Sequence, residues 1–138
     1  MYILGGKMQI KKITTNSHKA KEYFLEEISF TISPESLKDK LKDDLKEMNV
    51  IDVRAYDDYI DGHIPFAIHI PIETLDEHLA MLDKDKINII YSYCPYCTLG
   101  AKAAYLLAEK GYIAMVLRGG YHIWSQKGFE TVKTSANE

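Results

Sequence analysis

The sequence lacks any apolar run close to the roughly 20 residues that a helix needs to span a bilayer. It also lacks a large excess of positive or negative residues, because its 17 Lys and Arg nearly balance its 20 Asp and Glu. The resulting net charge of −3 gives no reason to expect binding to nucleic acid or to an anionic membrane surface. The opening MYILGGKMQIKK has no basic region before its short apolar piece, so no secretory signal is predicted. We therefore expect a cytoplasmic protein that starts at Met1 or Met8.

Cysteine is scarce, since the chain has only Cys94 and Cys97, both in the segment YSYCPYCTLG. Two cysteines three positions apart do not make the disulfide framework of a small secreted protein. The sequence also has no glycine-rich phosphate loop and no dinucleotide fingerprint, so we predict no organic cofactor. A chain of 138 residues with 46% apolar residues suits one domain with one sizeable core.

Short apolar segments alternate with segments of helical spacing along the chain. The strand candidates are FTI (30–32), NVIDVR (49–54), AIHIPI (67–72), INIIYSY (87–93) and IAMVL (113–117). Helices are predicted over 15–28, from the N-cap and proline pair Ser33-Pro34 onward, over 73–82 and over 98–110. This alternation predicts an α/β fold with a parallel sheet and helices on both faces.

Cys94 stands where the clearest strand candidate ends and a helix begins. In open α/β sheets, ligands bind at the carboxyl ends of the strands. The N-terminus of the following helix supplies partial positive charge and free backbone N–H groups. A cysteine in this place is expected to be a thiolate more often than a free cysteine is.

The C-P-Y-C segment allows four interpretations. The two cysteines can be small buried core residues, or zinc ligands, although there is no second cysteine pair and the five histidines lack ligand spacing. They can exchange disulfides, since C-P-Y-C is also the glutaredoxin motif, although there it follows the first strand near the N-terminus. They can transfer sulfur, with a cysteine persulfide as the covalent intermediate.

Several segments together, and in order, resemble the rhodanese family. VIDVRAYDDYIDGHIPFAIHIPI (50–72) is similar to the family's aspartate-x-arginine strand end and its Gly-His-Ile-Pro segment. IIYSYC (89–94) resembles the strand that leads into the catalytic cysteine, and AAYLLAEKGY (103–112) resembles the helix after the active loop. VLRGGYHIW (116–124) is similar to the family's Gly-Gly turn and tryptophan. The resemblance covers roughly residues 31–130, and several spaced motifs are more specific than C-P-Y-C alone.

The resemblance implies a three-layer α/β/α domain with a mostly parallel five-stranded sheet over residues 31–132. We expect residues 1–30 to form an extension with one helix packing on the domain, and 133–138 to form a flexible tail. Cys94 then matches the nucleophile that forms the persulfide. The active loop would bind the substrate through Pro95, Tyr96, Thr98, Leu99 and Gly100, with Lys102 as a weaker candidate. Asp52, Arg54, His63, Gly119 and Gly120 are expected to be structural residues near the site, and no metal is expected.

The sequence departs from the family pattern in the active loop and after His-Ile-Pro. Cys97 stands at a glycine place, Leu99 at the arginine place and Gly100 at the serine place. Without the arginine the loop loses a charge for thiosulfate, so activity with that donor is expected to be weak. A phosphatase of this fold needs Cys-x5-Arg, which Gly100 excludes. Phe66 replaces the usual glycine, which alters the loop or presents an aromatic surface.

Three hypotheses of function stay open. The first is a sulfurtransferase that moves sulfane sulfur from a small-molecule donor through Cys94 to a thiol acceptor, with Cys97 as a resolving thiol. Such a cycle would be recharged by a thioredoxin-type or glutathione-type reductant. The second is a thiol–disulfide oxidoreductase, and the third is a weakly active module that binds a partner or senses oxidants. The protein is expected to be a monomer or a homodimer.

Overall fold

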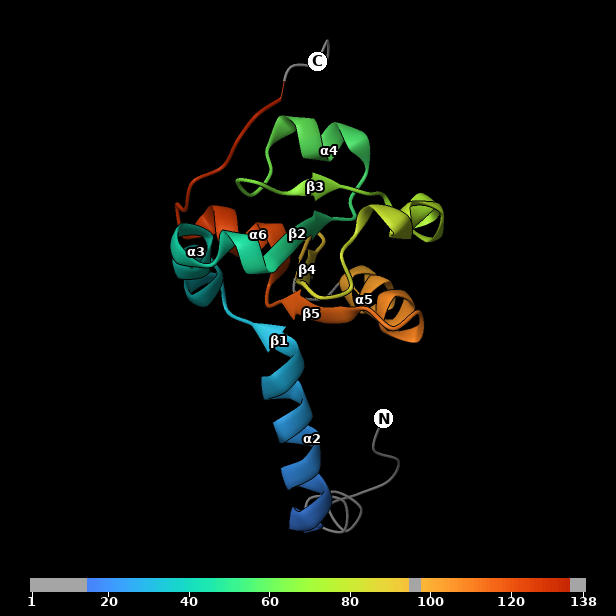
Figure 1. Ribbon diagram of the computed structural model, residues 1–138. Helices are drawn as coiled ribbons and strands as arrows, with labels where there is room; N and C mark the ends of the chain where they lie inside the picture. Colours follow the sequence, from blue (N-terminus) through green and yellow to red (C-terminus); the bar gives the residue numbers. More distant parts are fainter. Residues whose placement is uncertain (1–14, 95–97, 135–138) are drawn as a thin grey trace, which may run out of the picture. The chain divides into compact units, whose positions relative to one another are not determined.

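The computed structural model describes residues 15–94 and 98–134. The described residues fall into two compact units that meet at the Phe30–Thr31 bond. The first unit contains helix α2 (Ser17–Phe30), where Asn16 caps the first turn by accepting the Lys19 N–H at 3.1 Å. The second unit contains every strand that the structure describes (Figure 1).

The second unit is built on a five-stranded sheet in the order β1-β5-β4-β2-β3, with all pairs parallel. The strands are β1 (Thr31–Ile32), β2 (Met48–Asp52), β3 (Ile68–His69), β4 (Ile87–Tyr91) and β5 (Ile113–Leu117). The predicted α/β fold with a central parallel sheet is thereby confirmed. Strands β2 and β4 lie in the middle of the sheet, so their carboxyl ends place Asp52 and Tyr91 side by side in register.

Helices cover both faces of the sheet (Figure 1). Helices α3 (Pro34–Asp43) and α6 (Gly120–Gln126) lie on one side, while α5 (Leu99–Glu109) and the 3-10 turns η2 (Ile72–Met81) lie on the other. Helix α4 (Tyr56–Asp61) lies beside β3, and the short 3-10 turn η1 (Leu45–Glu47) leads into β2. The segment 73–82, predicted as a helix, takes the tighter 3-10 form. Its backbone hydrogen bonds then join residues three positions apart instead of four.

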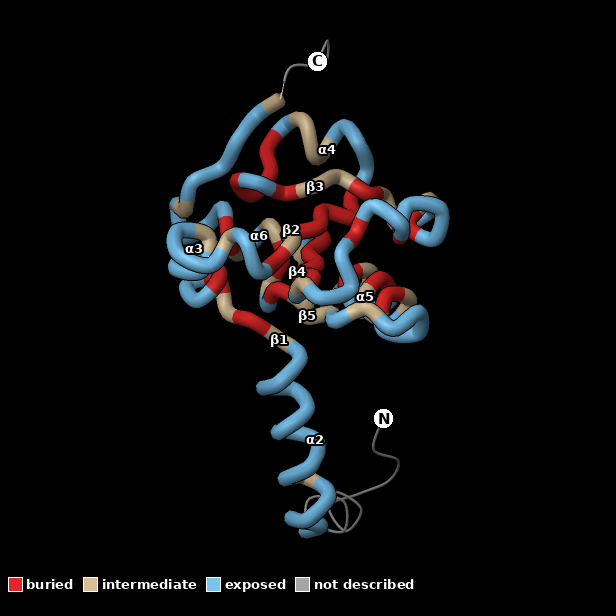
Figure 2. The backbone as a smooth tube through the Cα atoms, viewed as in Figure 1, coloured by how far each residue is buried: buried red, intermediate tan, exposed pale blue. Residues whose placement is uncertain are grey.

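The side chains of the central strands alternate between two apolar clusters. Val50, Ile89 and Tyr91 pack with Leu37 of α3 and Trp124 of α6. Ile51, Val53 and Ile90 pack on the opposite face. There they meet Leu75 and Leu79 of η2 and Ala103 and Leu107 of α5. Buried residues are accordingly concentrated in β2 and β4 (Figure 2). Because both faces of these strands are covered, their sequences are nearly all apolar.

Among the described residues, no helix is both long enough and apolar enough to cross a membrane. Within 15–94 and 98–134, no cluster of three His, Cys, Asp or Glu side chains is suited to hold a metal ion.

Candidate active site

Cys94 lies just after the carboxyl end of β4 and is partly buried. Of the predicted active loop, Pro95, Tyr96 and Cys97 lie outside the described residues. Thr98 is exposed and precedes α5, while Leu99 is partly buried and Gly100 is buried. A Cβ atom on Gly100 would stand 3.4 Å from Val116 Cγ1, an ordinary van der Waals contact between α5 and β5. Lys102 follows in the first turns of α5 and is exposed.

A glycine turn holds the backbone that leads into Cys94. Gly119 and Gly120 both have positive φ, at 79° and 60°. Residues other than glycine rarely adopt this region of backbone conformation. A Cβ on Gly120 would lie 2.8 Å from the carbonyl oxygen of Ser92 and 3.0 Å from the nitrogen of Cys94. The first residues of α6 then bond to the same backbone, since Tyr121 N donates to Ser92 O at 2.8 Å. His122 N donates to Tyr93 O at 2.7 Å, so α6 fixes both peptides before the cysteine.

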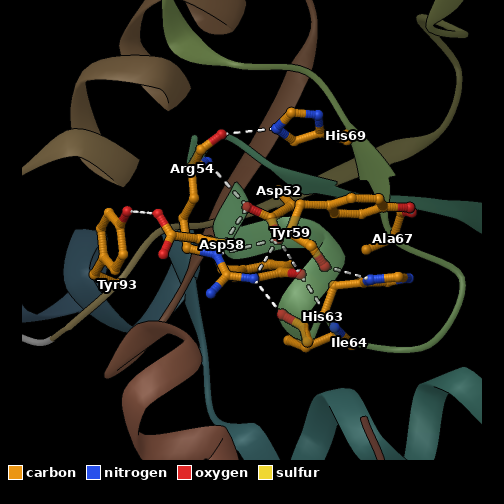
Figure 3. Close-up of polar contacts among 11 residues, drawn as sticks. Asp52, Arg54, Asp58, Tyr59, His63, Ile64, Ala67, His69 and Tyr93 are labelled. Carbon is orange, nitrogen blue, oxygen red and sulfur yellow. Dashed lines mark hydrogen bonds and ion pairs between the residues drawn. The ribbon is translucent and has the colours of Figure 1, made fainter. Parts of the chain in front are cut away.

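The expected Asp52–Arg54 ion pair is present and fully buried beside this backbone (Figure 3). Arg54 Nε donates to Asp52 Oδ1 at 3.0 Å and Nη2 donates to Oδ2 at 2.8 Å. The second bond of Nη2 goes to the carbonyl oxygen of Gly62 at 2.6 Å, which ties the end of β2 to the loop after α4. Tyr91 joins this ion pair as a third group, because its hydroxyl donates to Asp52 Oδ2 at 2.7 Å.

The charges in this cluster are stabilised by each other. Burial alone lowers the pKa of Arg54, but the hydrogen bonds and the charge of Asp52 outweigh it and raise that pKa. Burial, followed by the charge of Asp52, raises the pKa of Tyr91 well above its usual range. Arg54 therefore stays cationic and Tyr91 stays a neutral hydrogen-bond donor.

Tyrosine rings surround the Arg54 guanidinium. Its central carbon lies 4.1 Å from the ring centre of Tyr121, 5.6 Å from that of Tyr91 and 5.8 Å from that of Tyr93. Rings at these distances attract a guanidinium through their negative faces. Tyr93, which directly precedes Cys94, also donates its hydroxyl to Asp58 of α4 (Figure 3). The residue before the cysteine is thus anchored to two other elements.

His63 belongs to an aromatic stack with Tyr59 and His69. Its ring stacks on Tyr59 at 3.9 Å between centres, and the other side of Tyr59 stacks on His69 at 4.7 Å. Carbonyl oxygens only accept, so His63 Nδ1 donates to Tyr59 O at 2.9 Å and His69 Nε2 donates to Arg54 O at 2.7 Å. The imidazole of His63 therefore bonds to backbone, which is what the sequence predicted for it.

Sequence reasoning missed the three tyrosines and Asp58. Tyr91 and Tyr93 bracket Ser92 in the YSYC segment, and Tyr121 directly follows the glycine pair. Their shared feature is position, since all three adjoin motifs that were recognised. The signal that could have found them is a tyrosine next to each motif: Tyr91 and Tyr93 end the predicted strand, and Tyr121 follows the glycine pair.

Comparisons with known proteins agree with this arrangement. Residues 33–127 match the family model described as the rhodanese-like domain. The chain belongs to that family. The BH2092 protein of Bacillus halodurans has a similar structure, with a TM-score of 0.79 at 29% identity. That match covers 86% of this chain and 88% of the other.

Two curated relatives of this rhodanese-like chain differ in their names. A sulfurtransferase of Allochromatium vinosum is 30% identical over 106 residues, which is 73% of this chain and 92% of that protein. The HTH-type transcriptional regulator Rv0324 of Mycobacterium tuberculosis is 34% identical over 82 residues. This match covers 59% of the chain but only 36% of the regulator, so the chain spans about a third of that protein's length. Relatives of this rhodanese-like chain therefore carry the names of both a sulfurtransferase and a transcriptional regulator.

Proposed function

We propose that the protein is a sulfurtransferase with Cys94 as the nucleophile. The observation that carries this proposal is the place of Cys94 in a rhodanese-like domain. It follows the carboxyl end of a central strand, and its backbone is held by the Gly119-Gly120 turn. Such a strand end is where ligands of α/β sheets bind. The sulfurtransferase name of the Allochromatium relative supports the same activity.

The reaction proceeds in two balanced steps. The Cys94 thiolate attacks the outer sulfur of thiosulfate, the S–S bond breaks, and its electron pair leaves with sulfite. Cys94 then carries one additional sulfur as the persulfide Cys94–S–S⁻. An acceptor thiolate attacks that outer sulfur and leaves as a persulfide, while Cys94 returns as a thiolate. This is covalent catalysis in which one displacement is divided into two easier ones.

Cys97 is proposed as a resolving thiol. Its thiolate attacks Sγ of the protonated Cys94 persulfide, the outer sulfur leaves as hydrosulfide, and a Cys94–Cys97 disulfide remains. A thioredoxin-type or glutathione-type thiol then reduces this disulfide. Cys97 lies outside the described residues, so the three-residue spacing in the sequence is what supports this step.

Intact mass of the reduced protein after incubation with thiosulfate or glutathione persulfide tests the nucleophile. We expect a gain of one sulfur atom in the wild-type protein and in Cys97→Ser, and no gain in Cys94→Ser. The persulfide should persist longer in Cys97→Ser than in the wild type, because the resolving attack is removed. Sulfur retained on Cys94→Ser would contradict the assignment, and equal lifetimes would exclude the resolving role.

A binding module is the second candidate, favoured by one observation. A segment of this chain is 34% identical to part of the regulator Rv0324, whose name describes transcriptional control. The same mass measurement separates the two functions. In Cys97→Ser, which cannot form the internal disulfide, transfer adds one sulfur atom and a purely binding role adds none. In the wild type oxidised without a sulfur donor, disulfide exchange gives a loss of two hydrogens that glutathione reverses.

A further inference from the structure

Helix α2 presents large apolar side chains at its surface and contains no buried residue (Figure 2). Between 55% and 66% of the surface is exposed at each of five residues, which are Tyr23, Phe24, Leu25, Ile28 and Phe30. A helix of 14 residues is marginal in water by itself, because most helical stability in proteins comes from packing of an apolar face. A contiguous set of exposed apolar side chains marks a surface that another chain covers.

Three apolar residues of α2 lie on one face of the helix. Ala20, Phe24 and Ile28 are four positions apart, so they form a stripe with Phe24 in its middle. In an antiparallel pair of such helices, related by a two-fold axis at Phe24, Ala20 of one copy would be level with Ile28 of the other. The small side chain would then face the large one, whereas a parallel pair would leave a gap between two alanines.

The charges of α2 oppose its own dipole. Every basic side chain precedes every acidic one, in the order His18, Lys19, Lys21, Glu22, Glu26 and Glu27. The amino end of a helix is partly positive and its carboxyl end partly negative, so this order is unfavourable within one helix. An antiparallel second copy offsets it, because the basic end of each helix lies alongside the acidic end of the other. A parallel copy would bring like charges together.

We propose that α2 pairs with α2 of a second copy of the chain, antiparallel and centred on Phe24, and so makes the protein a homodimer. A helix about 21 Å long and about 10 Å wide offers less area than the about 800 Å² that each partner contributes to a standard interface. The dimer is therefore expected to dissociate reversibly at micromolar concentrations. This pairing does not depend on the chemistry of Cys94.

Sedimentation equilibrium of the full chain at micromolar concentrations measures the association. Phe24→Glu places a charge in the middle of the stripe and should weaken the association about 30-fold or more. The matched control Met81→Glu, at a residue that is 62% exposed in the second unit, should associate as the wild type does. A monomeric wild type would overturn the proposal and leave the rest of the chain, or a different partner, to cover α2. Equal weakening in both variants would overturn it too.

Exchange of charges tests the antiparallel order. Lys19→Glu with Lys21→Glu makes α2 strongly acidic, and Glu26→Lys with Glu27→Lys makes it strongly basic. Each double variant alone should associate about tenfold or more weakly than the wild type. An equimolar mixture of the two should recover the association, and so should a chain with all four changes, whose two ends are again opposite in charge.

The matched control for the charge exchange is Lys42→Glu with Lys46→Glu, because both residues are exposed in the second unit. It changes the net charge of the chain as much as the acidic double variant does, and it should associate as the wild type does. Double variants in α2 that associate like the wild type would refute the antiparallel pairing. A loss that neither the mixture nor the fourfold exchange recovers would refute it as well.

Discussion

The backbone before Cys94 is held in place by the glycine turn and the first residues of α6. An added Cβ on Gly120 would lie 2.8 Å from the Ser92 carbonyl oxygen, so glycine lets the chain pass close to it. This close approach allows the N–H groups of Tyr121 and His122 to bond to the backbone before Cys94. Any larger residue would push these peptides apart. The absence of a side chain at Gly120 therefore controls the backbone geometry that leads into Cys94.

Gly120→Ala is expected to destabilise the domain by about 2 kcal/mol or more, because positive φ and a clash with backbone act together. Gly128→Ala is the matched control, since Gly128 has φ 73° and nothing within 4 Å of an added Cβ. It should cost only about 1 kcal/mol, from the backbone conformation alone. Urea unfolding of both variants gives the comparison. A smaller loss for Gly120→Ala than for Gly128→Ala would refute the packing argument.

Arg54→Lys keeps the charge but removes the planar fork. A single ammonium cannot hold both oxygens of Asp52 and the Gly62 carbonyl in the arrangement observed, so buried acceptors lose their donors. We expect a loss of about 2 to 4 kcal/mol in the free energy of unfolding.

Arg118→Lys is the control for that change, because Arg118 makes one side-chain bond, to Thr31, and is exposed. It should cost less than about 1 kcal/mol. Equal losses in the two variants, measured by denaturant unfolding, would show that the buried fork contributes nothing special.

At the scale of elements, helix α3 shows how local sequence sets a boundary. Ser33 has extended backbone, its hydroxyl accepts the Ser36 N–H at 3.1 Å, and Pro34 begins the helix with a fixed φ. Leu37 is fully buried and Leu41 and Leu45 pack partly against the same cluster. The cap fixes where the helix starts, and the apolar stripe fixes which side faces the sheet.

Ser33→Ala is expected to lower the free energy of unfolding by about 1 kcal/mol, because one N–H of the first turn loses its partner. Ser125→Ala is a suitable control, since its hydroxyl donates to the His122 carbonyl on an exposed surface and caps no helix start. That change should stay within about 0.5 kcal/mol. Thermal or urea unfolding that ranks the two variants the other way would disprove the role of the cap.

The periodicity of apolar residues and the signals at helix ends predicted the helices and strands, because both are properties of short stretches of sequence. The five strands and the Ser33 cap follow from short segments. Phe66 shows the limit of this reasoning. It takes a φ of 69°, a region that favours glycine, and the residue is 64% exposed, so the expected aromatic surface is present and the backbone is strained. Whether a loop bends or accepts strain depends on contacts that are distant in sequence.

At the scale of the whole molecule, the strand order brings the site together. The carboxyl ends of β2 and β4 are neighbours, so Asp52 and Tyr91 meet although they are 39 positions apart. Sequence reasoning identified Asp52, Arg54 and Cys94 as strand-end residues. It could not identify Tyr91, Tyr93 and Tyr121 as the surroundings of Arg54, because a cation–π contact across elements leaves no periodic signal.

This buried network makes the stability of the domain sensitive to alkali. Burial and the charge of Asp52 raise the folded pKa of Tyr91, and burial also raises that of Tyr59. An unfolded tyrosine loses its proton near pH 10, whereas the folded ones keep theirs, so the unfolded state binds fewer protons above that pH. Stability is then fully present below about pH 10 and falls above it, by up to about 1.4 kcal/mol per pH unit for each such tyrosine.

Urea unfolding between pH 8 and pH 11.5 measures this slope. Tyr91→Phe should be less stable than the wild type at pH 8, because the Asp52 carboxylate and the Ile64 N–H both lose their bonds to the hydroxyl. Its stability should nevertheless fall less steeply above pH 10, so that the two curves converge. Parallel curves for Tyr91→Phe and the wild type would mean that the buried hydroxyl does not link folding to pH.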